Sequence, residues 1–582
     1  MTGRLSVAGF SLPTPLRDPV DLALERALAE HWVERVWSKD ATLWSTDEPV
    51  QASIRQRLGW LHVPEAFLED VDELRAFAEG VREQGFTQAV LCGMGGSSLA
   101  PEVLAATYGL APGAGMPLHV LDSTDPDAVR WTRETFDPAT TLYLISTKSG
   151  TTTETLSFLA SFWDQETHGR GIPWPQLHFA AITDPGKNME SIPHYNEFRE
   201  VFLNPTDVGG RYSALTYVGC VPGALLGIDL ARLLEQGVRM AQRCREDGAD
   251  NPGLALGVTL GALAKAGRDK LTFLADPAIA PFGAWVEQLI AESTGKHGVG
   301  IVPVDREPLG PVEAYGQDRV FVRLQLSGSA GWRTATDPLV EALATAGHPV
   351  LEIAVDPELG LGAEFFRWEF ATAIAGAVLG INPFDEPNVT ESKENTKRVL
   401  AEYREHGRLP ALDTLAAEGP LTLAGDAVLR LSAGPGTVMG ELRRHLARIK
   451  PNGYLAIQAY MAPSAERTAA LQAIRALLRD RTGRATTLGY GPRFLHSTGQ
   501  LHKGGAPIGW FLQLVAGHPR DLPVPGAGYS FGTLIDAQAL GDFQALEAHE
   551  LPVLRVGCSD DPATGLAALR DALEAALAGT AV

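Results

Sequence analysis

Cysteine is scarce in this chain of 582 residues, which has four cysteines and no CxxC pair. This scarcity argues against a disulfide framework or a thiolate metal site and is typical of a reducing compartment. Basic residues are also in deficit, because 49 Lys and Arg against 70 Asp and Glu give a net charge of −21. We therefore expect no nucleic-acid partner, since such a surface needs clustered basic side chains. A few convergent donors could still bind a small anion.

Long apolar runs are missing as well. The N-terminus lacks the unbroken apolar core of a signal peptide. The longest strongly apolar helical stretch, around residues 371–381, is much shorter than the ~20 residues that span a bilayer. We therefore expect a soluble, cytoplasmic protein without membrane contact. The length exceeds what one hydrophobic core supports, which predicts several α/β lobes.

The order of apolar patterns predicts the fold. The first 80 residues place apolar side chains at spacings of three and four, which indicates helices. Short apolar runs then alternate with amphipathic stretches, which predicts doubly wound parallel sheets in an α/β fold. This alternation starts again twice along the chain. The predicted parts are an N-terminal helical segment (1–80), two doubly wound domains (81–250 and 251–405) and an additional C-terminal α/β lobe (406–582).

Two turns in the first predicted domain are rich in Gly, Ser and Thr. They are CGMGGSS at 92–98 and ISTKSGTTTE at 145–154. Backbone N–H groups, hydroxyls and a helix N-terminus at the carboxyl end of a parallel strand suit a phosphate. Neither turn has the spacing of a dinucleotide fingerprint or a P-loop. The first turn is weak evidence for a ligand and is more simply a tight turn that needs glycine. The second turn, which carries Lys148, favours phosphate binding.

Other charged residues gain meaning only in combination. The segment WVEQLIAESTGK at 285–296 predicts a helix on which Gln288 and Glu292 share a face. Taken singly, Glu292, Arg211 in GGRYS and Lys393 in NVTESK could be exposed surface charges. We find no His and carboxylate cluster with ligand spacing, so no metal site is expected.

The segment FLHSTGQLHKGG contains His496 and His502 between glycines. The two histidines are six residues apart and have no carboxylate or cysteine partner close in sequence. A flexible loop and an acid/base role therefore both remain open for this segment.

Together these segments resemble the glucose-6-phosphate isomerase family, whose members have sugar-isomerase (SIS) domains. GMGGSS, STKSGTTTET, VGGRYSALTYVG, EQLIAESTGK and INPFDEPNVTESK occur in the family's order between Gly93 and Lys393. The chain is also similar to the isomerase half of transaldolase–isomerase fusions, without room for a transaldolase barrel. The resemblance implies two SIS-type αβα sandwich domains, a small sugar-phosphate substrate, no cofactor and a possible homodimer.

The resemblance also implies roles for individual residues. Glu292 corresponds to the base that moves a proton between C1 and C2, Arg211 to the residue that stabilises the enediolate, and Lys393 to a lysine near the ring oxygen. The implied substrate-binding positions are Gly96, Ser97, Thr147, Lys148, Ser149, Thr152 and Gln288.

One family feature is missing. The family has a histidine in a GQH segment between the catalytic glutamate and lysine, but the corresponding stretch here, GPVEAYGQDRVF, has Asp318. The similar STGQLHKGG lies more than 100 residues after Lys393. We therefore expect His502 to be the acid that opens the sugar ring, with His496 and then His297 as alternatives.

The expected reaction is the interconversion of glucose 6-phosphate and fructose 6-phosphate through a cis-enediol(ate). Two alternatives stay open at this point: a sugar-phosphate-binding regulator without catalysis, and an isomerase that also accepts mannose 6-phosphate.

Overall fold

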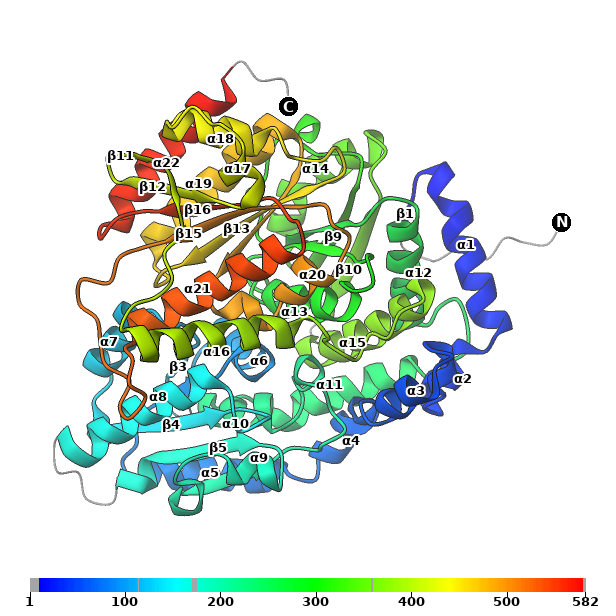
Figure 1. Ribbon diagram of the computed structural model, residues 1–582. Helices are drawn as coiled ribbons and strands as arrows, with labels where there is room; N and C mark the ends of the chain where they lie inside the picture. The colour runs from blue at the N-terminus through cyan, green and yellow to red at the C-terminus, as the bar shows by residue number, and fades with distance from the viewer. Residues whose placement is uncertain (1–9, 112, 114, 170–174, 357–359, 579–582) are drawn as a thin grey trace.

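In a computed structural model, the chain forms three mainly parallel β-sheets, which are covered by helices (Figure 1). The structure describes residues 10–111, 113, 115–169, 175–356 and 360–578. The predicted α/β class with doubly wound parallel sheets is confirmed. None of the described helices combines the length and the apolar character that crossing a bilayer requires.

The first sheet has the order β3-β2-β4-β5-β6, and all its strands are parallel. Its central strands are buried on both faces, which explains why they could be predicted as short apolar runs. The order changes direction between β2 and β4, so the loops that follow these two strands share a crevice. The strands are β2 (Gln88–Cys92), β3 (Leu118–Leu121), β4 (Thr141–Ser146), β5 (Phe179–Thr183) and β6 (Glu200–Leu203). The helices of this lobe are α6 (Leu99–Tyr108), α7 (Pro126–Thr135), α8 (Thr153–Asp164), α9 (Lys187–Glu190), α10 (Tyr217–Leu226) and α11 (Leu230–Arg243).

The second sheet repeats this topology with the order β1-β10-β9-β7-β8. The two-residue edge strand β1 (Phe10–Ser11) runs antiparallel to β10, and it was not predicted because it is too short to show a pattern. The other strands are β7 (Lys270–Ala275), β8 (Val302–Val304), β9 (Arg319–Leu326) and β10 (Val350–Val355). The helices are α12 (Pro252–Lys265), α13 (Phe282–Thr294), α14 (Ala330–Thr345) and α15 (Gly360–Leu379).

The N-terminal segment is helical, as predicted, but it does not stand apart from the lobes. Helix α1 packs on α12, α4 on α11, and α5 on α10. Buried Trp32 and Trp60 belong to the same apolar core as the helices of both following lobes. The helices are α1 (Thr14–Ala29), α2 (Trp32–Trp37), α3 (Glu48–Arg55), α4 (Val63–Phe67) and α5 (Val71–Glu83).

The C-terminal lobe has the third sheet, in the order β11-β12-β16-β15-β13-β14. Strands β13 to β16 are parallel, while the hairpin β11–β12 is antiparallel and pairs with β16. The strands are β11 (Thr414–Glu418), β12 (Leu421–Gly425), β13 (Tyr454–Tyr460), β14 (Ala485–Tyr490), β15 (Gly509–Val515) and β16 (Val553–Gly557). The helices are α17 (Ala427–Leu431), α18 (Val438–Leu446), α19 (Ala465–Thr482), α20 (Gly499–Gly504), α21 (Phe531–Ala548) and α22 (Pro562–Leu577).

Helix α16 (Val389–His406) connects the second lobe to the third. It ends where Gly407 adopts a φ of 69°, a conformation that favours glycine. The predicted domain boundary after residue 405 therefore falls at a helix end. The helix itself packs along α21 of the C-terminal lobe (Figure 1), so the spatial division lies before α16 rather than after it.

The buried imidazole of His445 on α18 provides a test of the C-terminal core. Its Nε2 lies 2.9 Å from the carbonyl oxygen of Phe511, and burial lowers the pKa of His445 to about 3. Below pH 6.5 the unfolded state binds a proton that the folded state excludes, so this group makes the protein less stable as the pH falls. We expect the free energy of unfolding to drop by about 1.4 kcal/mol per pH unit more than in His445→Gln between pH 6.5 and 4.5.

Urea unfolding followed by tryptophan fluorescence at several pH values measures this difference. Glutamine can still donate to Phe511, so the variant should fold. Exposed His297→Gln is the control and should keep the slope of the unchanged protein. Equal slopes for His445→Gln and the unchanged protein would contradict the assignment.

Candidate functional site

The loop between β4 and α8 is shaped by its hydroxyl groups and by one glycine. The buried Thr147 hydroxyl lies 3.0 Å from the hydroxyl of Thr152, and the Ser149 hydroxyl accepts a hydrogen bond from that of Thr151 at 3.0 Å. Gly150 has a φ of +65°, and a Cβ there would collide with the carbonyl oxygen of Asn188. Only glycine therefore fits at this bend, which leads the chain into α8.

A cavity lies in front of this loop. Its walls come from the loop, from α16 and from the C-terminal lobe, so three segments far apart in the sequence enclose it. Two lysines of α16 and the first residues of α8 are among its lining, and this combination favours an anion. The residues used below are Ser149, Thr151, Thr152, Glu154, Lys393, Lys397, His496 and Gln538.

Lys148 is expected from the sequence to contact phosphate, but its ammonium group is bonded to other parts of the protein. Its ammonium donates to the carboxylate of Asp184 at 2.7 Å and to the carbonyl oxygen of Val208 at 2.8 Å. These contacts fasten the loop to the end of β5 and to the segment before the GGRYS motif. Lys148 thus fixes the position of the loop in this structure, and it is not among the residues that line the cavity.

The glycine-rich turn after β2 is the meeting point of three segments. A Cβ on Gly96 would collide with the carbonyl group of Gly210, which precedes Arg211. A Cβ on Gly95, whose φ is +53°, would collide with the carbonyl oxygen of His496. Ser97 completes this short 3-10 turn and is half-buried. The two glycines therefore allow the arginine and histidine segments to approach the turn closely.

Arg493 ties the first lobe to the C-terminal lobe through Asp122, after β3, and Glu102, on α6. Its Nε donates to Asp122 Oδ2 at 2.5 Å and its Nη2 lies 2.6 Å from Glu102 Oε2. Arg493 begins the 3-10 turn that ends at His496. The two bonds of Arg493 therefore hold the turn that contains His496 against the first lobe.

Arg211 and Glu292 form a buried pair beside this turn. Arg211 Nη1 lies 3.4 Å from Glu292 Oε1 and 3.1 Å from Glu386 Oε2, and its Nε donates to Ser293 Oγ at 2.8 Å. The exposed fractions are only 2% for Arg211 and 8% for Glu292. Burial raises the pKa of Glu292 above 4.5, although Arg211 opposes this shift. The result is a desolvated carboxyl next to a fixed cation.

A chain of hydrogen bonds joins Glu292 to the cavity. Gln288, one turn before Glu292 on α13, donates through Nε2 to Glu292 Oε2 at 3.1 Å and to the carbonyl oxygen of His496 at 2.7 Å. The His496 ring reaches Glu154 in the first turn of α8, with 3.0 Å between Nε2 and Oε1. Glu292, Gln288 and His496 thus form one connected group with the hydroxyl-rich loop.

Glu154 itself is buried and held from the C-terminal lobe. Gln538 Nε2 donates to Glu154 Oε1 at 2.6 Å. Burial acts to raise the pKa of Glu154, but His496, a backbone hydrogen bond and Lys393 together lower the pKa overall. An ionised carboxylate only accepts hydrogen bonds, so His496 donates from Nε2.

His502 does not lie where the sequence led us to expect the acid. It is buried on α20 among Tyr454, Phe494 and Phe511, with ring centroids 5.1 to 6.2 Å apart. Burial lowers its pKa well below 6.5. His297 is exposed in the turn after α13. Of the three candidates, His496 is the one that lines the cavity.

Three charged residues near Arg211 were missed by the sequence analysis. Lys296 donates to the carboxylate of Asp385 at 2.7 Å, and burial lowers the pKa of Lys296 to about 8. Glu386 contacts Arg211 and lies 3.6 Å from Arg57. Lys296, Asp385 and Glu386 all fall inside the two family motifs EQLIAESTGK and INPFDEPNVTESK, and this position was the only signal available.

The described residues contain no group of three or more His, Cys, Asp and Glu side chains that could hold a metal ion. Of the residues expected to bind substrate, Ser149 and Thr152 line the cavity, whereas Thr147 lies behind Thr152. Lys393 lines it from α16.

Comparison with known proteins agrees with this geometry. Residues 64–302 match the phosphoglucose isomerase family. The glucose-6-phosphate isomerase of Rubrobacter xylanophilus is 29% identical over 384 residues, which cover 58% of this chain and 88% of that protein. The enzyme of the same name from Thermus thermophilus is 28% identical over 385 residues, covering 59% and 90%.

Two solved structures share the fold. The hypothetical protein TT0462, also from Thermus thermophilus, superposes with a TM-score of 0.57 and 26% identity, covering 67% of this chain and 100% of that one. A glucose-6-phosphate isomerase from Chlamydia trachomatis gives a TM-score of 0.53 at 19% identity, covering 70% and 92%. The residues that match the family include the β2 and β4 loops, Arg211 and Glu292. The chain is thus similar to the phosphoglucose isomerases over residues 64–302.

Proposed function

We propose that this protein is a glucose-6-phosphate isomerase that interconverts glucose 6-phosphate and fructose 6-phosphate. The observation that supports this most directly is the connected group of Glu292, Gln288 and His496 between a buried arginine and a hydroxyl-lined anion cavity. A sugar phosphate needs both ends of this arrangement, one for its phosphate and one for its reacting carbons.

The phosphate is assigned to the cavity at the loop after β4. Ser149, Thr151 and Thr152 offer hydroxyl donors, and Lys397 supplies positive charge from α16. Anchoring the phosphate orients the sugar, so these contacts contribute to turnover as well as to affinity. Lys148 acts indirectly here, through its bonds to Asp184 and Val208.

Glu292 is assigned as the base. Its carboxylate removes the proton from C2 of the open-chain aldose and returns it to C1, which needs a base whose pKa is nearer to neutral than that of an ordinary glutamate. Desolvation shifts the pKa of Glu292 in this direction. Arg211 stabilises the negative charge that develops on the enediolate oxygens, and losing such a donor typically costs about 3 kcal/mol.

Ring opening is assigned to His496 in place of His502. Because Nε2 of His496 donates to Glu154, Nδ1 is the nitrogen that can exchange a proton with the sugar. Lys393 lines the same cavity and can assist at the ring oxygen. Glu154 and Gln538 are positioning residues that orient the imidazole.

Substituting Glu292 by Gln tests the proposed reaction. The variant keeps the shape of the side chain and removes the base, so we expect turnover to fall at least about 1,000-fold while the affinity for fructose 6-phosphate changes little. A coupled assay of glucose 6-phosphate formation measures turnover, and isothermal titration measures affinity. The unchanged enzyme should lose activity as the pH falls through the raised pKa of Glu292, because the base must be ionised.

Two results would contradict the assignment. Near-normal turnover of Glu292→Gln would remove Glu292 as the base. Binding of fructose 6-phosphate to the unchanged protein without any turnover would instead indicate a regulator. Assays with mannose 6-phosphate in parallel decide whether the enzyme also accepts the C2 epimer.

A second experiment distinguishes the roles of His496 and His502. We expect His496→Gln to lower kcat on the closed-ring sugar at least about 100-fold, because ring opening loses its proton carrier. His502→Gln should keep kcat within a few-fold and reduce thermal stability, since it disturbs an aromatic core. Steady-state kinetics and the thermal midpoint are measured for both variants. A loss of kcat in His502→Gln alone, with a stable fold, would reverse the assignment.

A further inference from the structure

The first two sheets share one topology. In each, the first strand lies between the second and the third, as β3-β2-β4-β5 and as β8-β7-β9-β10. In each, a helix follows the first strand, α6 after β2 and α13 after β7, and these two helices pack against each other. The two lobes are therefore related by an approximate internal repeat.

This repeat defines two corresponding crevices. The site described above lies where the first sheet changes direction, between the loops after β2 and β4, and α13 of the other lobe faces it with Gln288 and Glu292. The corresponding place is the point between β7 and β9 where the second sheet changes direction, faced by α6. Open α/β sheets bind ligands at such points.

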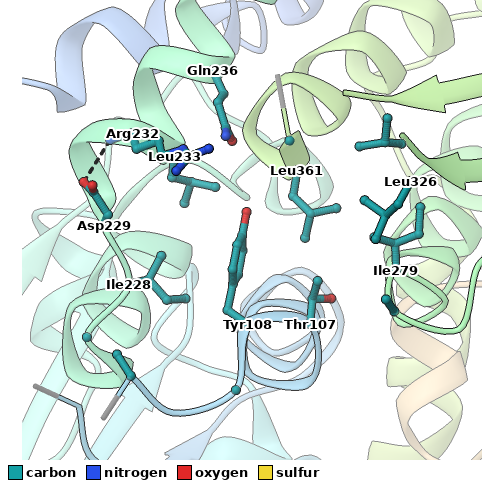
Figure 2. Close-up of a pocket in the computed structure, with 16 residues that line it drawn as sticks. Thr107, Tyr108, Ile228, Asp229, Arg232, Leu233, Gln236, Ile279, Leu326 and Leu361 are labelled. Atoms are coloured by element: carbon teal, nitrogen blue, oxygen red, sulfur yellow. Dashed lines mark hydrogen bonds between the residues drawn. The ribbon is translucent and has the colours of Figure 1, made fainter. Parts of the chain in front are cut away.

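A cavity of about 510 Å³ lies at this second position (Figure 2). Ala278 and Ile279 follow β7, Leu326 ends β9 and Val355 ends β10, so one wall is the carboxyl edge of the second sheet. The opposite wall includes Tyr108 at the end of α6. The volume falls within the range of about 300 to 1,000 Å³ that is usual for small-molecule sites.

The lining of this second cavity differs from that of the first. Where α13 presents an amide and a carboxylate, α6 presents Thr107 and Tyr108. The carboxylate in this lining, Asp229, caps α11, because its Oδ1 accepts a hydrogen bond from the backbone N–H of Arg232 at 3.1 Å. The Tyr108 ring stands between Ile228, Leu361 and the pair Ile279 and Leu326 (Figure 2). Apolar side chains thus supply most of the contact surface.

Polar groups gather at one end of the cavity. The Tyr108 hydroxyl points to the side on which Gln236 lies, and Arg232 is on the same helix as Gln236 (Figure 2). Gln236 is only 4% exposed. An apolar body with a few polar groups at one end is the usual make-up of a site for a small organic ligand.

We propose that this cavity is a second small-molecule site, which binds an amphipathic compound. Its apolar ring or branched body lies against Ile279, Leu326 and Leu361, and its hydrogen-bonding or anionic end faces Gln236 and Arg232. The site binds without isomerising, because α6 contributes only Thr107 and Tyr108 to the lining where α13 contributes Glu292 to the first site.

The test uses 8-anilinonaphthalene-1-sulfonate, an aromatic anion that fluoresces strongly in apolar sites, and the full-length protein. We expect saturable binding with one site per chain. Leu326→Asp puts a carboxylate on the half-buried apolar wall and should raise the Kd at least about 10-fold. Ile228→Trp fills the cavity from its opposite side and should do the same.

The matched control is Leu309→Asp, which places the same charge on a leucine that is 59% exposed and outside the cavity. It should leave the Kd unchanged, and saturating fructose 6-phosphate should not displace the probe. Circular dichroism and thermal midpoints confirm that each variant is folded.

Three results would overturn the proposal. Probe binding that is insensitive to both cavity variants, or that fructose 6-phosphate abolishes, would place the probe elsewhere. Self-association in sedimentation velocity that Leu326→Asp alone abolishes would make the cavity a contact between copies of the chain. None of these experiments measures isomerase activity, so their results do not depend on whether the proposed reaction is correct.

Discussion

The Gln288 side chain holds the candidate site together. Its amide donates at once to Glu292 and to the backbone carbonyl of His496, and so connects the second lobe with the C-terminal lobe. Glu292 is buried and His496 is half-buried, and a buried acceptor without a donor would cost about 1 to 3 kcal/mol. The positions of Glu292 and His496 are therefore coupled through one amide, so a small displacement of either lobe affects both residues.

Buried charge around Arg211 is costly unless each group has partners. The guanidinium contacts Glu292 and Glu386 and also donates to the carbonyl oxygens of Pro383 and Asp385. These bonds give the cation several partners while Glu292 stays desolvated. The raised pKa of Glu292 and the lowered pKa of Lys296 are both consequences of this dry, charge-rich environment. The buried charges that make this place in the fold less stable are thus the same ones that make it reactive.

The sequence carried most of the architecture but only part of the site. Buried parallel strands are apolar runs, and tight loops need Gly, Ser and Thr, so β2, β4 and their loops could be located directly. The motif residues Arg211, Gln288 and Glu292 lie together in the structure because each sits on a rigid element next to a sheet edge. Local patterns of this kind are visible in a single sequence.

Contacts between distant segments could not be predicted in the same way. Glu154 and His496 are 342 residues apart, and nothing in either segment indicates the other. His502 stands in the segment most similar to the expected motif, yet its neighbours in three dimensions are aromatic rings. The position of Lys148 is decided by Asp184 on the next strand, which a loop sequence does not reveal.

The origin of His496 in the C-terminal lobe has a consequence for how the two chemical steps can be separated. The proposed base Glu292 and Arg211 belong to the first two lobes, while His496, the proposed proton carrier for ring opening, lies beyond the linker after Gly407. Cleavage of that linker, or a motion that moves the third sheet away from the other two, would abolish ring opening before it affected the proton transfer between C1 and C2. What remained would be a catalyst restricted to the small fraction of sugar that is already linear in solution.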